Sequence, residues 1–91
     1  MQNKTILFYW SKGADIRRKI LNIIRQANQK NRPVFLNSLA KTLDLSHVAV
    51  KKHVDLMVEE GFLEEINPGG KPIYLRLSKD GVAVLTEFSK R

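Results

Sequence analysis

The stretch DLSHVAVKKHVDLMVEEG, residues 44–61, decides the fold of this chain. Val50, Val54 and Met57 recur at the spacing of one face of a helix, which predicts a helix with a buried apolar stripe. Ser46 suits the N-cap of this helix, because a serine hydroxyl accepts a hydrogen bond from a backbone N–H two or three residues later. We therefore expect a helix that begins after Ser46 and ends just before the glycine that closes the stretch.

The opposite face of this helix changes character along its length. It is small and basic near its start, and it becomes acidic at Glu59 and Glu60. The residues that fall outside the apolar arc are Val48, Ala49, Lys51, Lys52 and Asp55. Such a gradient suits insertion of the N-terminal half into a groove lined by phosphates, with the acids held back from the polyanion. An ordinary solvated helix face has a similar composition, so the neighbouring segments have to decide between the two interpretations.

Two further helices are predicted before this one. Between residues 15 and 29, apolar residues recur at spacings of 4, 3, 1 and 3, and they are Ile16, Ile20, Ile23, Ile24 and Ala27. A proline then separates this helix from a short extended segment, VFL, at residues 34–36. Asn37 or Ser38 is expected to cap the second helix. The turn into the third helix lies at residues 44–45.

After residue 61 the hydrophobic period changes to that of strands. FLEEI (62–66) and IYLRL (73–77) are predicted to form two strands, because apolar residues of the second alternate with outward ones. The segment NPGGKP between them is rich in proline and glycine, which is typical of a hairpin tip. Ser78 suits the cap of a last helix, whose apolar spacing is Val82, Leu85 and Phe88. These elements predict an α+β fold that is mostly α.

Composition limits the class of protein. The chain has 91 residues, enough for one small domain with a thin core, so a partner subunit would help to stabilise it. It has no cysteine, which excludes disulfides and cysteine-based metal or redox sites. Its longest apolar run, residues 6–10, is too short to span a membrane, and we expect a soluble intracellular protein.

The charge of the chain is strongly positive but unevenly placed. A formal charge of +7 and a pI near 10.0 favour a polyanionic partner, although small domains are also basic without one. The balance is +6 over residues 1–30, zero over residues 31–61 and +1 over residues 62–91. The third helix is therefore not the most basic part of the chain, and charge alone does not make it a binding element.

Two short helices joined by a tight turn and followed by a hairpin are a known way of placing the second helix in the major groove of DNA. In this chain the residues of that pattern are Leu39, Ala40, Leu45, Ser46, Val50, Val54, Met57, Gly61, Phe62, Leu63 and the hairpin before LSKDG. With them the chain resembles winged helix–turn–helix regulators of the ArsR/MarR type over roughly residues 14–88. The resemblance implies the order helix, short strand, helix, helix, β-hairpin wing and helix. It also implies a transcriptional regulator that binds specific sequences of double-stranded DNA.

The resemblance and the exposed helix face together predict the site residues. Major-groove readout is expected from the recognition-helix residues Ser46, His47, Val48, Ala49, Lys51 and Lys52. The resemblance implies that the hairpin is a wing that touches the DNA backbone or minor groove through Gly69, Gly70, Lys71 and Arg76. At the start of the second helix, Asn37 and Ser38 are expected either to hold a phosphate or to act as a plain cap. The basic N-terminal third is expected to neutralise further phosphates.

Residues 1–13 are interpreted as an apolar and aromatic arm, ahead of a domain at residues 14–91, that either packs on the first helix or pairs with its mate in a second subunit. Related regulators commonly dimerise through terminal elements, so the resemblance implies a homodimer. Its expected contacts are Ile6, Phe8, Trp10, Leu85 and Phe88. A dimer would also place two recognition helices on half-sites about one DNA turn apart. We expect no room for a separate sensor domain, so a small-molecule effector would either bind at that interface or not exist.

The sequence contains no group of residues that predicts catalysis. It has neither a phosphate-cradling loop nor a His–carboxylate cluster, and His47 and His53 are six residues apart instead of the four that bring two metal ligands together. We expect no enzymatic activity, no metal and no cofactor. Specific DNA reading predicts a cytoplasmic, nucleoid-associated protein without membrane contact. The alternatives are a non-specific chromosomal or RNA-binding protein that uses its basic first helix, and a winged helix used for protein–protein contact.

Overall fold

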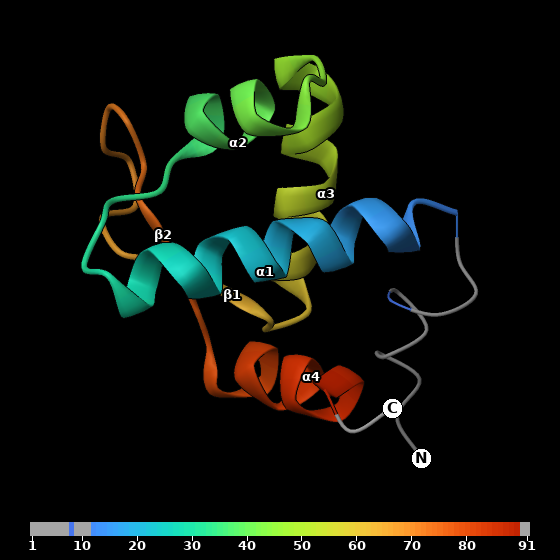
Figure 1. Cartoon of the computed structure of the whole chain (residues 1–91). Coiled ribbons are helices and arrows are strands. Elements are labelled where there is room, and N and C mark those ends of the chain that lie inside the picture. Colours follow the sequence, from blue (N-terminus) through green and yellow to red (C-terminus); the bar gives the residue numbers. More distant parts are fainter. Residues whose placement is uncertain (1–7, 9–11, 90–91) are drawn as a thin grey trace.

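The computed structural model describes residue 8 and residues 12–89. The elements of this part of the chain follow the predicted order, with one difference at residues 34–36 (Figure 1). They are α1 (Ala14–Gln29), α2 (Leu36–Leu43), α3 (His47–Glu59), β1 (Leu63–Glu65), β2 (Leu75–Leu77) and α4 (Lys79–Ser89). None of the helices among these residues is long and apolar enough to cross a membrane.

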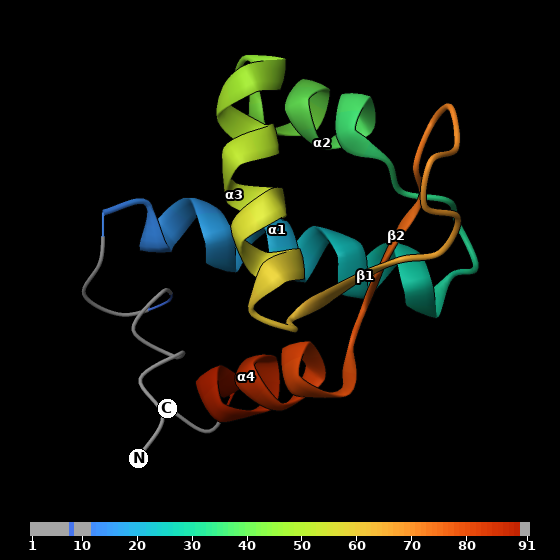
Figure 2. The same ribbon diagram turned by 180° about the vertical axis from the view of Figure 1, so that it is seen from behind.

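The elements are arranged around α1, which crosses the middle of the molecule. In Figure 1 α1 lies in front of α3, and in Figure 2, seen from behind, α3 lies in front of α1. Both views place α2 and the tip of the hairpin at one end of the molecule and α4 at the other. The turn between α2 and α3 and the hairpin tip are therefore at the same end of the molecule, with α2 between them.

The inner side of α1 forms the centre of the core. Ile20, Leu21 and Ile24 have no exposed surface, because α1 packs against β2, α3 and α4. The predicted stripe is confirmed at two of these positions, while Ile16, Ile23 and Ala27 are only partly buried against the core. Arg17 lies on the same inner side and is 4% exposed, which no apolar pattern predicts.

The start of α2 differs from the sequence-based expectation. The helix begins at Leu36 with Phe35 as its N-cap, so neither Asn37 nor Ser38 occupies the cap position. Ser38 contributes from inside the first turn: its hydroxyl accepts a hydrogen bond from the Phe35 N–H (3.0 Å) and donates one to the Phe35 carbonyl (2.7 Å). The expected strand at residues 34–36 is reduced to a single bridge between Phe35 and Tyr74, because the helix takes up its last residue.

The turn into α3 and both ends of that helix agree with the prediction. Asp44 adopts a left-handed conformation (φ 55°, ψ 46°) that ends α2, and the Leu45 N–H donates to the Ala40 carbonyl over 3.0 Å. The Ser46 hydroxyl accepts a hydrogen bond from the Ala49 N–H over 3.1 Å, which confirms the N-cap. Gly61, after the last turn, has a φ of 88°, which a residue without Cβ adopts without strain.

The two strands form an antiparallel hairpin with the register Leu63↔Leu77, Glu64↔Arg76 and Glu65↔Leu75. Leu63 and Leu75 face the core, with 2% and 3% exposed. Asn28 near the end of α1 accepts a hydrogen bond from the Leu77 N–H through Oδ1 (3.1 Å), which ties the edge of the hairpin to α1. The hairpin is therefore held from one side by apolar burial and at its edge by a side chain of α1.

The last helix, α4, turns a different face to the core than its spacing suggests. The Ser78 hydroxyl caps it by accepting from the Gly81 N–H (3.1 Å), as predicted. Val84 and Leu85 are 7% and 2% exposed, whereas Val82 is 47% exposed, so the expectation for Val82 is wrong. Val84 follows Val82 by two residues and therefore lies about 200° around the helix, on the side that α4 turns toward α1 and β2.

The two valines of α4 give a matched test of this packing. We expect Val84→Ala to lower the free energy of unfolding by about 1.5 kcal/mol, because it removes two buried carbon atoms. The same change at the exposed Val82 should alter it by less than about 0.5 kcal/mol. Urea denaturation of both variants measures the difference, and equal losses at the two positions would contradict the observed orientation of α4.

Candidate nucleic-acid interface

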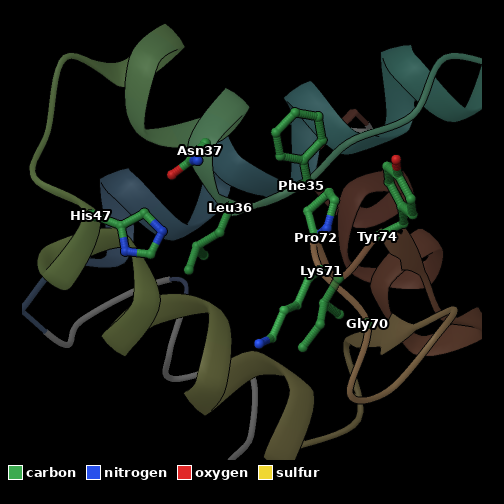
Figure 3. Close-up of a pocket in the computed structure, with 9 residues that line it drawn as sticks. Phe35, Leu36, Asn37, His47, Gly70, Lys71, Pro72 and Tyr74 are labelled. Carbon is green, nitrogen blue, oxygen red and sulfur yellow. The ribbon is translucent and has the colours of Figure 1, made fainter.

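The start of α3 and the hairpin tip border a common groove of about 630 Å³. Figure 3 shows His47 and Asn37 on one side of this groove and Lys71 and Pro72 on the other. The floor is apolar and includes Phe35, whose ring packs edge-on against Tyr74 with centroids 5.8 Å apart. The structure thus brings the predicted recognition helix and the predicted wing to two rims of one depression.

The outer face of α3 presents most of the predicted readout residues to solvent. Ser46, His47, Lys51 and Lys52 are exposed, and Ala49 is half-buried. Val48 is 67% exposed, the highest value among the large apolar residues that are exposed in the described chain. An apolar side chain left in water at the start of a helix costs hydration free energy that a partner surface would recover. The exposed start of α3 therefore has the properties of a contact surface.

The two lysines of α3 are not equivalent. The Lys51 Nζ lies 2.7 Å from Oδ2 of Asp55 one turn later, and this hydrogen bond and the carboxylate charge raise the pKa of Lys51. Lys52 forms no ion pair with any residue that the structure describes. A phosphate would have to compete with Asp55 for Lys51, whereas Lys52 and His47 have no such competitor on α3.

The hairpin tip is braced by Asn67, a residue that the sequence-based prediction did not include. Its side-chain oxygen accepts from the Tyr74 N–H (2.8 Å), and its Nδ2 donates to the Pro72 carbonyl (3.1 Å). Gly70 packs so closely on this side chain that a Cβ there would lie 2.2 Å from Nδ2 of Asn67. The packing of the hairpin itself therefore requires glycine at position 70, in addition to the predicted contact of the wing with DNA. The Asn-Pro pair that opens the tip was the available signal.

The two wing cations differ in the same way as the lysines of α3. Lys71 is exposed at the tip beside the groove. Arg76 lies further down on β2, where its Nε donates to Oε1 of the cross-strand residue Glu64 over 2.8 Å. Lys71 is therefore available to an anion, and Arg76 is engaged within the hairpin.

At the start of α2, the structure separates the two predicted phosphate-contact residues. Asn37 is exposed in the first turn of the helix. The hydroxyl of Ser38 is used both as donor and as acceptor toward Phe35, so it has no proton left for a phosphate. For Ser38 the capping role, which was the alternative at this position, is the one that the geometry supports.

Arg17 and His53 connect α1 to the middle of α3. Nη1 of Arg17 lies 3.1 Å from Nδ1 of His53, and Nη2 donates to the Lys12 carbonyl over 2.6 Å. A guanidinium has only donors, so Nδ1 of His53 must be the unprotonated acceptor. Burial lowers the pKa of Arg17, and burial together with the charge of Arg17 lowers the pKa of His53. Arg17 is thus removed from the cations of the N-terminal third that were expected to meet phosphates.

The predicted dimer contacts are only partly within the described residues. Ile6, Trp10 and the side chain of Phe88 lie outside them. Phe8 is 0% exposed and packs edge-on against Phe62 with ring centroids 4.9 Å apart, and Leu85 is 2% exposed. Side chains enclosed in the core of their own chain offer no surface to a partner, so this conformation does not support a dimer contact at Phe8 and Leu85.

The histidines do not form part of a metal cluster in the described chain. Among residue 8 and residues 12–89, no three His, Asp or Glu side chains are close enough together to hold an ion. His47 is exposed at the rim of the groove, and His53 is half-buried against Arg17.

Comparison with known proteins identifies the fold. No protein-family model matches the sequence, and no curated protein does so. Solved structures match with TM-scores between 0.64 and 0.70. One is a mutant of MarR from E. coli complexed with operator DNA, at 24% identity and a TM-score of 0.67, covering 79% of this chain and 50% of that chain.

Two further structures support the same assignment. The oxidized form of MarR from E. coli is 26% identical with a TM-score of 0.66, covering 79% of this chain and 49% of that one. The adhesin competence repressor AdcR from Streptococcus pyogenes is 21% identical with a TM-score of 0.70, covering 94% of this chain and 63% of that one. The chain thus spans about half the length of the MarR structures. Its fold is the winged helix–turn–helix of these MarR-like proteins, which confirms the predicted fold class, and these neighbours are regulators instead of enzymes.

The contact between Arg17 and His53 predicts a dependence of stability on pH. The ordinary pKa of histidine is 6.5, and that of folded His53 is lower. The stabilising contribution is therefore complete above pH 6.5 and is lost as the pH falls through the lowered pKa, since the unfolded chain binds the proton first. We expect the free energy of unfolding in urea to fall more between about pH 7.5 and about pH 5 in the wild type than in His53→Gln. Glutamine can accept a hydrogen bond from Arg17 but does not titrate.

The exposed His47 gives the control for this experiment. His47→Gln should keep the pH dependence of the wild type, because the contact between Arg17 and His53 is intact in this variant. Identical pH dependence in the wild type and His53→Gln would contradict the role of His53.

Proposed function

We propose that this chain is a transcriptional regulator that binds specific sequences of double-stranded DNA, with α3 in the major groove and the hairpin as a wing. The observation that carries the proposal is the common groove bordered by the exposed start of α3 and by Lys71 at the hairpin tip. A helix with its side chains is about 10–12 Å across, and the major groove of B-DNA is about 12 Å wide.

The distribution of residues on α3 supports insertion by its N-terminal end. The helix carries no acid before Asp55, and its glutamate lies in the last turn. Val48, highly exposed, and Ala49 suit apolar contact with thymine methyl groups, while Lys52 and His47 suit hydrogen bonds to guanine or phosphate. Lys71 would contact the backbone from the other rim of the groove.

The solved structures support the same function. MarR shares the fold over 79% of this chain, and its structure was determined complexed with operator DNA. This chain spans about half of the MarR chain. The DNA partner, the oligomeric state and the cellular location of this protein are therefore included in our proposal. We place it in the cytoplasm as a homodimer that reads two half-sites about one DNA turn apart. The candidate dimer contacts are the arm residues Ile6 and Trp10 and the end of α4.

A second candidate function is non-specific binding to chromosomal DNA or RNA. The observation that favours it is the concentration of cations in and around α1 instead of α3. Titration against random duplex and against genomic fragments at several salt concentrations separates the two. A preferred fragment supports specific regulation, whereas equal affinity for all fragments with a steep salt dependence supports the second function. Absence of binding at low salt would overturn both and leave the winged helix as a protein-contact module.

Because Lys51 is paired with Asp55 and Lys52 is in no ion pair among the described residues, substituting each lysine separately tests whether α3 is the recognition helix. We expect Lys52→Ala to weaken binding to the preferred duplex by about 1 kcal/mol, or roughly fivefold, and to reduce the salt slope by about one. Lys51→Ala should cost less, because Lys51 is already paired with Asp55. Fluorescence anisotropy measures both, with Lys79→Ala at the far end of the molecule as control. Unchanged affinity in the Lys51→Ala and Lys52→Ala double variant would show that α3 is not the reader.

The wing is tested by a second pair of cations. Lys71→Ala should weaken binding by roughly twofold to fivefold for all sequences, since a single phosphate contact carries no sequence information. Arg76→Ala should have a smaller effect, because its guanidinium is engaged by Glu64. A larger loss at Arg76 than at Lys71 would mean that the strand, and not the tip, approaches the DNA.

A further inference from the structure

The positive charge of the chain is separated from its recognition elements. Residues 12–32, which contain α1, hold seven cations and one acid. Residues 33–89, which contain α2, α3, the hairpin and α4, hold six cations and eight acids. The part of the molecule that contains the proposed reading elements therefore has no excess of positive charge, and the attraction for a polyanion resides in the segment around α1.

The cations of α1 lie on one face of the helix. Lys19 and Lys30 are exposed on the side turned away from the core, Arg18 and Arg25 are half-buried at its edge, and Lys12 and Arg32 lie beyond the two ends of the helix. Its acid, Asp15, is in contact with Arg18. At 100° per residue, Lys19 falls on the arc opposite the buried Ile20, Leu21 and Ile24, whereas Arg18 and Arg25 fall at the edge of the buried arc. The result is a basic strip about 24 Å long, as expected for a helix of this length.

This basic strip and the outer face of α3 point in opposite directions. The inner sides of the two helices face each other, since Arg17 on α1 reaches His53 on α3 over 3.1 Å. Figure 1 shows α1 in front of α3, and Figure 2 shows the reverse order from behind. A straight duplex that receives the start of α3 in its major groove therefore does not pass over the exposed face of α1.

We propose that the basic strip of α1 is a second phosphate-binding surface, which holds a second segment of duplex DNA while α3 reads the first. The inference rests on the proposed function. We choose duplex DNA as the partner of this surface because the charges are complementary. A duplex presents about one negative charge per 1.7 Å of its axis, so phosphates can face a basic strip along its whole length. An anionic membrane fits less well, because the apolar side of α1 fills the core and has no residues left to insert among lipids.

The exposed Lys19 allows a test with a matched control. Lys19→Glu reverses one charge on the strip, and Lys79→Glu makes the same change at the exposed start of α4, away from both surfaces. The preferred genomic duplex is fixed to beads, the protein is bound to it, and capture of a labelled random duplex is measured. We expect Lys19→Glu to reduce capture of the second duplex roughly fivefold or more, while its affinity for the first duplex in anisotropy stays within about twofold. Lys79→Glu should behave as the wild type in both measurements.

The outcomes separate this inference from the function on which it rests. If the wild type does not bind the first duplex, the proposed function fails. If it binds the first duplex but captures no second one, only the second surface is overturned. If Lys19→Glu lowers the affinity for the first duplex as much as it lowers capture of the second, the second surface is also overturned. In that case α1 and α3 would contact the same DNA segment. If Lys52→Ala abolishes capture of the second duplex and Lys19→Glu does not, the two duplexes are held by the two recognition helices of a dimer, and the basic strip has no part in it. Intact circular dichroism and melting temperature of both variants show that neither result arises from unfolding.

Discussion

The burial of one side of α1 is the constraint on which the rest of the structure depends. Ile20, Leu21 and Ile24 are fully enclosed because β2, α3 and α4 all pack against this one helix. Two polar contacts orient the neighbours on this surface: Arg17 meets His53 on α3, and Asn28 accepts from the Leu77 N–H on β2. Apolar burial is non-directional, so these hydrogen bonds are what gives the neighbouring elements a defined position on it.

The exposure of the proposed reading surface follows from that packing. Once Val50, Val54 and Met57 are buried, the helix must turn Lys51, Lys52 and Val48 outward. The Asn67 network holds the hairpin tip, so that Lys71 stands across the groove from His47. Both rims of the groove are thus positioned by local hydrogen bonds and by the shared core. A rigid frame of this kind lets a few side chains contact a partner without the cost of ordering them first.

Charge and shape are distributed over different parts of the molecule. The recognition elements have the exposed apolar and polar groups that discriminate between binding partners, but they carry no excess of cations over acids. The cations lie around α1, where they supply attraction without discrimination. Ion pairs within the chain reduce the number of available cations on the recognition elements further, because Lys51 is paired with Asp55 and Arg76 with Glu64. Formal charge therefore overstates how many of the cations near the groove are available to a partner.

Local features of the fold and of the site could be predicted from the sequence alone. The cap by Ser46, the left-handed Gly61, the limits of α3 and the outward position of Lys52 depend on residues within about one turn of the chain. Such features follow from spacing and from the hydrogen-bonding capacity of each residue type. The winged helix–turn–helix fold could be predicted because the helices and strands that these local features indicate occur in the order typical of that fold.

Other properties were decided only by the tertiary structure. The burial of Arg17 needs His53, which is 36 residues away, and the bridge at Phe35 needs Tyr74. Val84 is buried and Val82 exposed because of where α4 meets α1 and β2, although either valine suits the helical period. The buried Phe8 packs edge-on against Phe62, a partner that the residue pattern alone does not identify. Each of these depends on which distant surfaces meet, and periodicity along one element carries no information about its partner.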